Sequence, residues 1–245
     1  MKYMWSKNRI SKYLLPIILK DRKPNQWYVE PFVWGANMID KVDGNRIWGD
    51  INKYLVSFLQ KLSHWEFKYR NNFYTREQYN EIRYNKEEYE RAEVWYVWIN
   101  CSYWWSWFES YSWKSNTAKW ERNYQQEAIR NIEKQLPWLK GVHFEIADYT
   151  KISTPFIDDW KTGAIIYCDK PYKWVREYNF DKWFNHTEFW EWCREKKKEW
   201  HTVFVSEYNA PEDFKCVWEK EVKSSLSANW KSWRNKNSTE KLFTI

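Results

Sequence analysis

Two short stretches of the sequence combine residue types that could do chemistry. Residues 30–37 read Glu-Pro-Phe-Val-Trp-Gly-Ala-Asn, and residues 169–172 read Asp-Lys-Pro-Tyr. In the second stretch, the aspartate carboxylate and a main-chain carbonyl can accept hydrogen bonds, and the tyrosine ring can stack on a flat group. Each stretch alone is also typical of ordinary turns. Their order along the chain and the elements around them must therefore carry the interpretation.

Both stretches follow apolar segments that predict β-strands. Residues 27–33 indicate a short buried strand followed by a turn, and residues 164–168 form the continuous apolar run of a fully buried strand. We expect further strands ending at Asp50 and spanning residues 142–147 and 201–206, with an antiparallel pair at 217–222 and 240–245. Helical spacing is found at residues 8–20 (interrupted at Pro16), 51–62, 75–91, 123–136 (ending at Pro137) and 186–199.

This alternation of strands and helices predicts an α/β domain. Its mostly parallel sheet would bind a ligand at the carboxyl ends of the strands. Residues 64–140 differ from the rest, because much of this block is rich in Tyr, Asn, Arg and Glu and has few long apolar runs. We therefore interpret residues 64–140 as an inserted, mainly helical subdomain between two segments of the α/β domain, 1–63 and 141–245.

Together, the two stretches resemble the motifs of the DNA adenine methylase (Dam-like) family. That family has a Pro-Phe-x-Gly-Gly cofactor loop and an Asp-Pro-Pro-Tyr catalytic loop, here in the alpha-type order with the recognition region between them. The resemblance implies a Rossmann-like methyltransferase domain in residues 1–63 and 141–245, with residues 64–140 as a target-recognition subdomain. It also implies transfer of a methyl group from S-adenosylmethionine to the N6 atom of adenine in double-stranded DNA.

The same resemblance assigns the catalytic residues. The target adenine must be flipped out of the duplex to be reached. The carboxylate of Asp169 and the main-chain carbonyl of Lys170 would accept hydrogen bonds from the N6 amino group, and Tyr172, after Pro171, would stack on the base. The sulfonium of the cofactor is a strong electrophile, so the enzyme mainly positions the reactants and needs no metal or covalent nucleophile.

The resemblance also assigns the residues that contact S-adenosylmethionine. Asp50 would bind the ribose hydroxyls, and Asp148 with Tyr149 would hold the adenine ring of the cofactor. The N-terminal segment contributes Tyr3, Trp5 and Lys7. The remaining contacts come from the ends of strands and from the cofactor loop: Glu30, Phe32, Trp34, Gly35 and Asp169.

The chain departs from the family pattern in two ways. Lys170 replaces the first proline of the catalytic loop. The chain also has 22 Trp and only 5 Gly, whereas glycine ordinarily makes up about 7% of residues. Trp34 stands where the cofactor loop needs glycine for close backbone approach. Many other tryptophans also stand where glycine is expected: Trp5, Trp48, Trp65, Trp95, Trp98, Trp104, Trp105, Trp113, Trp120, Trp138, Trp160, Trp174, Trp183, Trp200, Trp230 and Trp233.

Our hypothesis for these tryptophans is a difference in the genetic code. UGA codons would have been translated as Trp here, whereas the source of the gene reads them as Gly. The alternative is a chain that is truly rich in tryptophan. Trp34 in the cofactor loop predicts weak cofactor binding. Trp34 and Lys170 together keep open the alternative of a methyltransferase-like protein that binds nucleic acid without catalysis. Methylation of an amino group in RNA or protein is a second alternative.

Charge and composition limit the partners. The formal net charge is +7, and Lys223, Lys231, Arg234, Lys236 and Lys241 outnumber the single acid Glu240 in residues 223–241. Such a basic stretch suits a phosphate backbone, although a solvated loop explains it equally well. No run of about 18 apolar residues exists, and neither a signal peptide nor a metal-binding spacing of the four cysteines is found. We expect a cytoplasmic monomer, encoded by a bacterium or a phage.

Overall fold

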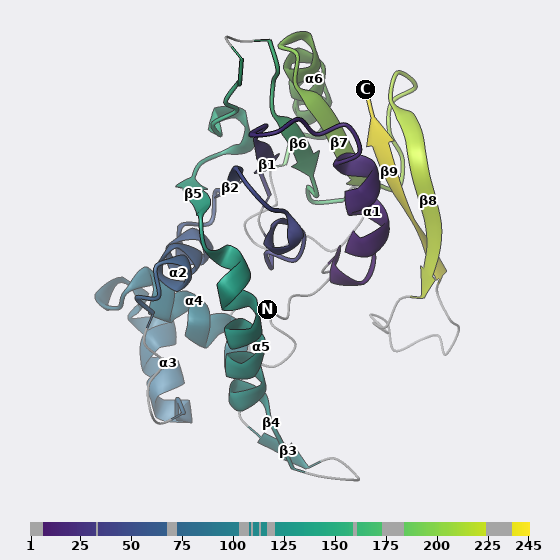
Figure 1. The fold of residues 1–245 in the computed structure, drawn as a ribbon. Helices are drawn as coiled ribbons and strands as arrows, with labels where there is room; N and C mark the ends of the chain where they lie inside the picture. Colours follow the sequence, from purple (N-terminus) through teal and green to yellow (C-terminus); the bar gives the residue numbers. More distant parts are fainter. Residues whose placement is uncertain are drawn as a thin grey trace. The chain divides into compact units, whose positions relative to one another are not determined.

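The computed structural model describes residues 7–32, 34–67, 73–102, 108, 110–112, 114–116, 121–158, 161–172, 184–223 and 237–245. The chain divides into two compact units. Unit 1 comprises residues 1–11 and 33–152, and unit 2 comprises residues 12–32 and 153–245. Both units combine strands with helices, in agreement with the predicted α/β class (Figure 1).

A parallel pair of strands forms the centre of unit 1. Strand β2 (Arg46–Asp50) pairs with β5 (Val142–Ile146) along its full length. Trp48 of β2 is buried, and its ring packs against Phe144 of β5 at 5.2 Å between ring centroids. Helix α2 (Lys53–Ser63) follows β2 and begins at Asn52, whose side chain accepts hydrogen bonds from two main-chain N–H groups of the first turn.

The rest of unit 1 is mainly helical. Helix α3 (Arg76–Tyr84) begins at a capping box formed by Thr75 and Gln78. Helix α4 (Arg91–Asn100) packs against α2, α3 and α5 (Tyr124–Leu139), and a short hairpin joins β3 (Lys114–Asn116) to β4 (Glu121–Asn123). Helix α5 continues past Pro137, where the sequence predicted its end, because Leu136 and Leu139 bury their side chains on either side of the proline.

Unit 2 contains a five-stranded sheet in the order β1-β6-β7-β9-β8. Strands β1 (Tyr28–Glu30), β6 (Ile165–Cys168) and β7 (Thr202–Glu207) are parallel, and β9 (Asn237–Thr244) runs antiparallel to both β7 and β8 (Lys215–Lys223). Helix α6 (His186–Lys198) packs against β7. Helix α1 (Ser11–Ile18) continues through Pro16, and its Tyr13 stacks on Trp218 of β8.

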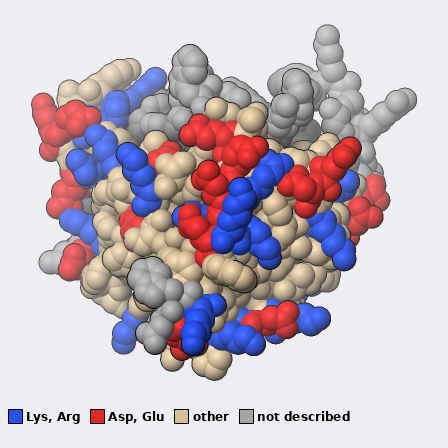
Figure 2. Space-filling model, turned by 90° about the horizontal axis from the view of Figure 1, so that it is seen from above, with Lys and Arg blue, Asp and Glu red and all other residues tan. Residues whose placement is uncertain are grey.

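Strand β8 is the last strand of this order within the part of the chain that the structure describes. A β-bulge interrupts its pairing with β9 between Cys216 and Trp218. The exposed side chains of β8 include charges of both signs, on Lys215, Glu219 and Glu221. This mixture of signs is also seen on the face of the molecule drawn in Figure 2, where basic and acidic side chains alternate.

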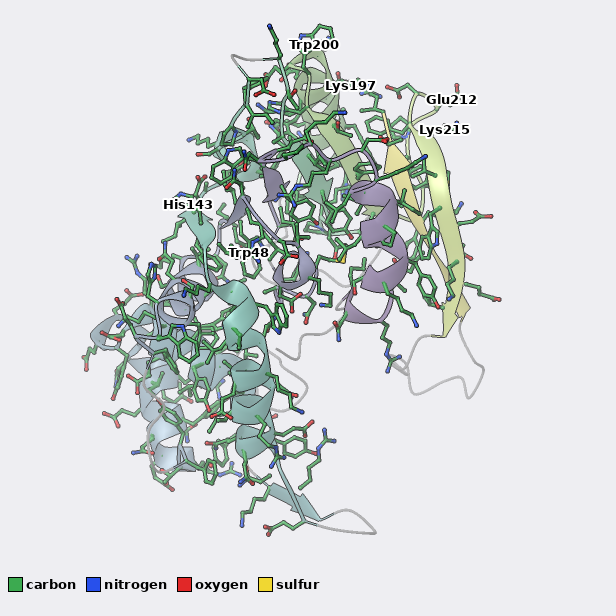
Figure 3. The ribbon with its side chains drawn as sticks, viewed as in Figure 1. Trp48, His143, Lys197, Trp200, Glu212 and Lys215 are labelled. Carbon is green, nitrogen blue, oxygen red and sulfur yellow. The ribbon has the colours of Figure 1, made fainter. Side chains whose placement is uncertain are left out.

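Two helices are followed by a tryptophan whose backbone has the left-handed conformation. After α2, Trp65 has a φ of 60°, and the N–H groups of Trp65 and Glu66 bond to the carbonyls of Leu62 and Lys61. After α6, Trp200 has a φ of 68°, and its N–H and that of the next residue bond to the carbonyls of Lys197 and Lys196 (Figure 3). Both are Schellman motifs, in which the left-handed position is usually glycine.

The backbone therefore supports the glycine hypothesis at some tryptophans and not at others. Among those described, Trp34, Trp65 and Trp200 have positive φ values. The other described positions lie in regular elements without positive φ: Trp48 in β2, Trp95 and Trp98 in α4, and Trp138 in α5. The remaining candidates lie outside the described residues: Trp5, Trp104, Trp105, Trp113, Trp120, Trp160, Trp174, Trp183, Trp230 and Trp233.

Candidate functional site

The loop of residues 169–172 begins where strand β6 ends. Strand β6 lies between the parallel strands β1 and β7 and is buried along its whole length. Asp169, Pro171 and Tyr172 are half-buried, whereas Lys170 is buried. The loop thus lies at the carboxyl end of an interior parallel strand, as the sequence predicted and as ligand sites of α/β sheets generally do.

Tyr172 is held in place by two neighbours. Its hydroxyl donates a hydrogen bond to Oε2 of Glu240 at 3.0 Å, and its ring meets the ring of Tyr208 edge-on, with 4.8 Å between centroids. Burial, with the nearby carboxylates of Asp169 and Glu240, raises the pKa of Tyr172 well above its ordinary value. The hydroxyl is therefore protonated at neutral pH and acts as the donor to Glu240.

The side chain of Lys170 is enclosed in the interior of unit 2. Its ammonium forms an ion pair with the carboxylate of Glu207, the last residue of β7, and lies 3.2 Å from Nδ1 of His186. Burial lowers the pKa of Lys170, and the carboxylate of Glu207 opposes this by favouring the charged form. The charge that distinguishes this loop from the family pattern is thus paired within the same unit.

Two of the predicted cofactor residues belong to unit 2. Glu30 ends strand β1, and its buried carboxylate accepts a hydrogen bond of 2.7 Å from the hydroxyl of Tyr28. The ring of Phe32 packs edge-on against the rings of Phe184 and Phe189, at 5.7 and 5.9 Å. Both side chains therefore have packing or hydrogen-bonding partners that fix the start of the predicted cofactor loop.

In unit 1, Asp50 and Asp148 lie at the carboxyl ends of the two paired strands. The N–H of Ala147 bonds to the carbonyl of Asp50, so the two strands remain joined at this edge. Oδ1 of Asp50 accepts the N–H of Asn52, and Oδ1 of Asp148 accepts the N–H and hydroxyl of Thr150. These local bonds orient both carboxylates at the edge where ligands of parallel sheets bind. Tyr149, next to Asp148, is buried.

The part of the predicted cofactor loop that belongs to unit 1 has an unusual backbone. Trp34 and Ala36 have φ values of 42° and 58°, in the left-handed region that favours glycine. The buried amide of Gln135 in α5 donates hydrogen bonds to the carbonyls of Gly35 and Ala36, at 3.3 and 2.8 Å. It also lies 2.8 Å from Oδ2 of Asp40. The loop conformation is thus tied to helix α5.

Two residues near these sites were missed by reasoning from the sequence. Gln135 lies about 100 positions from the loop that it holds, and no local pattern connects the two. Ile51 was assigned to the apolar face of the helix after Asp50. The helix begins only at Lys53, and the side chain of Ile51 is 65% exposed beside the carboxylate of Asp50. The sequence signal for this residue is its position directly after the aspartate that ends the strand.

The predicted site residues fall into two groups, one in each unit. Unit 1 holds Lys7, Trp34, Gly35, Asp50, Asp148 and Tyr149; Lys7 is buried in a 3-10 helix, Lys7–Arg9. Unit 2 holds Glu30, Phe32, Asp169, Lys170, Pro171 and Tyr172. Tyr3 and Trp5 lie outside the described residues, as do Lys231, Arg234 and Lys236 of the basic stretch.

Parallel strands with acidic residues at their carboxyl ends, and an Asp-x-Pro-Tyr loop after an interior strand, fit the class of methyltransferases that act on an amino group. Residues 3–238 match the D12 class N6 adenine-specific DNA methyltransferase family, and the chain belongs to that family. A search of curated proteins finds no match. The protein transfers a methyl group from S-adenosylmethionine to the N6 atom of adenine in DNA. This confirms the predicted fold class, reaction and cofactor.

No helix among the described residues is long and apolar enough to cross a membrane. Within the same residues, no group of three or more His, Cys, Asp or Glu side chains is placed to hold a metal ion. Cys101, Cys168 and Cys193 are buried thiols and Cys216 is an exposed one.

Proposed function

We propose that the loop of residues 169–172 carries out the methyl transfer. The observation that supports this role most strongly is the position of the loop at the carboxyl end of β6, with Tyr172 anchored to Glu240. The carboxylate of Asp169 and the carbonyl of Lys170 accept hydrogen bonds from the adenine amino group. The ring of Tyr172 stacks on the flipped base, and Pro171 limits the conformations of the loop.

The residues of unit 1 fit the nucleoside part of S-adenosylmethionine. Asp50 offers carboxylate oxygens for ribose hydroxyls, and the exposed side chain of Ile51 offers an apolar surface for the adenine ring. Asp148 accepts a hydrogen bond from the adenine amino group, and Tyr149 supports it. When bound, the cofactor supplies an activated methyl group. The remaining contacts are assigned to Tyr3, Trp5, Lys7, Glu30, Phe32, Trp34, Gly35 and Asp169.

Residues 64–140 are proposed as the target-recognition subdomain. Helices α4 and α5 of this block pack against α2, and α3 packs against α4. The basic stretch 223–241 is proposed to contact DNA phosphates. A monomer in the cytoplasm of a bacterium, or encoded by a phage, suits an enzyme that protects DNA from restriction.

The replacement Asp169→Asn tests the catalytic assignment. It preserves the size of the side chain but removes the charge that favours accepting from the amino group. Loss of one positioned hydrogen-bonding partner at a reacting centre typically costs about 100-fold or more in rate. We therefore expect kcat to fall by about 100-fold in a tritiated-methyl transfer assay on unmethylated duplex DNA, with a smaller loss of cofactor affinity because Asp169 is also assigned a cofactor contact.

The matched control is Asp21→Asn, because Asp21 is an exposed aspartate in a turn of the same unit. It should transfer label at the wild-type rate. Wild-type activity in the Asp169→Asn variant would refute the assignment of this loop. Label recovered in RNA or protein rather than in N6-methyladenine would favour the alternative substrates.

A further inference from the structure

We propose that Glu207 is a positioning residue for methyl transfer, because it fixes the catalytic loop by holding the side chain of Lys170 inside unit 2. The inference rests on the proposed catalytic role of residues 169–172. Glu207 itself ends strand β7, the neighbour of β6, and is not part of the loop. It would act through Lys170 and Tyr208 rather than by touching substrate.

The ammonium of Lys170 has a complete set of partners. The side chains of Lys170 and Glu207 are 0% and 5% exposed, and they form a direct ion pair. The ammonium also lies 3.2 Å from Nδ1 of His186 and 3.3 Å from the carbonyl of Pro171. Three acceptors therefore match the three hydrogens of an ammonium group, and His186 must present an unprotonated Nδ1 to serve as one of them.

Aromatic rings enclose the same ammonium. Its distances to ring centroids are 5.5 Å for Phe189, 5.5 Å for Trp190 and 5.8 Å for Phe184. Ring faces attract a cation at such distances and exclude water from it. Helix α6, Phe184 ahead of this helix, Pro171 and strand β7 therefore define the position of the Lys170 side chain.

Glu207 also reaches the other end of the loop. Its second carboxylate oxygen, Oε1, accepts the N–H of Tyr208 at 2.8 Å. The ring of Tyr208 meets the ring of Tyr172 at 4.8 Å. One carboxylate thus connects directly to Lys170 and, through Tyr208, to Tyr172, and Asp169 and Pro171 lie between or beside these two anchored residues.

The ion pair between Lys170 and Glu207 restrains the catalytic loop, whereas lysine itself, unlike proline, does not restrain the backbone. A proline at position 170 would fix φ near −65° by its ring, whereas a lysine leaves φ free. The carbonyl of this same residue is a proposed acceptor for the adenine amino group. A misplacement of about 1 Å at a reacting centre can cost about 100-fold in rate. Fixing the side chain of Lys170 in the interior is therefore a way to fix its carbonyl.

The double variant Lys170→Met/Glu207→Gln tests the proposal. It removes both charges together, so no buried charge is left unpaired and the fold is retained. We expect kcat to fall by about tenfold or more, with Tm and the calorimetric Kd for S-adenosylmethionine close to wild type. Adding a ring constraint instead, in Lys170→Pro/Glu207→Gln, should restore most of kcat.

The matched control is Lys196→Met/Glu199→Gln, which removes an exposed ion pair in unit 2 with the same substitutions. It should leave kcat unchanged. A kcat within twofold of wild type in Lys170→Met/Glu207→Gln would overturn the proposal. So would a parallel loss of kcat, Tm and cofactor affinity, because that pattern indicates a general loosening of the fold.

Asp169→Asn in the same assay distinguishes failure of the positioning role of Glu207 from failure of the proposed catalytic role of residues 169–172. If Asp169→Asn is inactive while Lys170→Met/Glu207→Gln has wild-type activity, only the role of Glu207 is refuted. If Asp169→Asn has wild-type activity, the loop is not catalytic and the inference fails with the proposed function.

Discussion

His201 is buried directly before strand β7, and its ring makes one hydrogen bond and one aromatic contact within unit 2. Its Nδ1 accepts the N–H of Ala164 at 2.9 Å, and its ring packs against Phe156 at 4.7 Å. Burial, together with the charge of Lys196, lowers the pKa of His201 to about 4, although Glu199 opposes the shift. The native state therefore holds this imidazole neutral, and a neutral Nδ1 is what the hydrogen bond to Ala164 requires.

The pKa of His201 predicts a loss of stability in acid. Below its ordinary pKa near 6.5, the unfolded chain binds a proton that the native state excludes. The stabilisation is thus fully present above pH 6.5 and is lost as the pH falls towards 4. Between pH 7 and pH 5 we expect the free energy of unfolding to fall by roughly 2 kcal/mol through this group, measured by urea denaturation.

The variant His201→Asn keeps a hydrogen-bond acceptor but cannot titrate, so this part of the pH dependence should disappear. His143→Gln is the matched control, because His143 is exposed on strand β5 (Figure 3). An equal fall in stability for wild type and His201→Asn would show that other groups govern the acid sensitivity.

Trp34 has a backbone conformation that is unfavourable for tryptophan. A φ of 42° places it in the left-handed region, which a bulky side chain occupies at a cost of roughly 1–2 kcal/mol. Gln135 holds the two following carbonyls, so the loop keeps this conformation despite the cost. The loop geometry is thus fixed by residues other than Trp34 and is the geometry that a glycine would adopt without strain.

The C-terminal ends of α2 and α6 share one feature: each is followed by a tryptophan in the left-handed conformation. Trp65 and Trp200 are 65% and 78% exposed, so burial of their rings contributes little that could offset the left-handed backbone. We expect Trp65→Gly and Trp200→Gly each to raise the free energy of unfolding by about 1 kcal/mol, measured by chemical denaturation.

Trp138→Gly provides the comparison. Trp138 is 59% exposed but lies within α5 with a helical backbone, where glycine costs about 0.5–1 kcal/mol. This variant should therefore be less stable than wild type. If all three glycine variants are destabilised to the same extent, the two helix ends do not favour glycine.

Helices and strands could be predicted where neighbouring residues formed a clear pattern of apolar and polar side chains. The apolar runs of β6 and β7 predicted their strands, and the spacing in α5 predicted its helix. Helix α4 was harder to predict, because it is buried on nearly every side and shows no apolar stripe. Its tryptophans were interpreted as glycines, which disfavour helices. The end of α5 was misplaced because the rule that proline ends a helix ignores the burial of Leu139.

For the molecule as a whole, the order of the motifs predicted the fold class and the reaction. It did not predict the contacts between residues that are far apart in the sequence. The chain passes between the two compact units after residues 11, 32 and 152, and the second of these boundaries falls within the predicted cofactor loop, which no local pattern indicates. Glu207 and Lys170 are 37 positions apart, and Gln135 and Gly35 are 100 apart. Such pairs are created by the folded topology. The limits of the recognition subdomain at residues 64 and 140 remain a prediction.

The composition of the whole chain leads to a prediction about its gene. If UGA has been read as Trp, the nucleotide sequence should have UGA at codons 34, 65 and 200, where the backbone favours glycine. Trp190, Trp192 and Trp218, whose rings pack against other aromatic rings, should have UGG. UGG at all six codons would establish a chain that is truly rich in tryptophan.

The charges and the bulge of strand β8 affect the tendency of the protein to aggregate at high concentration. An edge strand offers unpaired N–H and C=O groups to which a strand of a second molecule could add, which is a route to fibrillar aggregation. On β8, the charges of Lys215, Glu219 and Glu221 would lose water on such pairing, and the bulge near Cys216 disturbs the flat geometry that strand addition needs. The same strand that completes the sheet of unit 2 thereby discourages its extension into an intermolecular one.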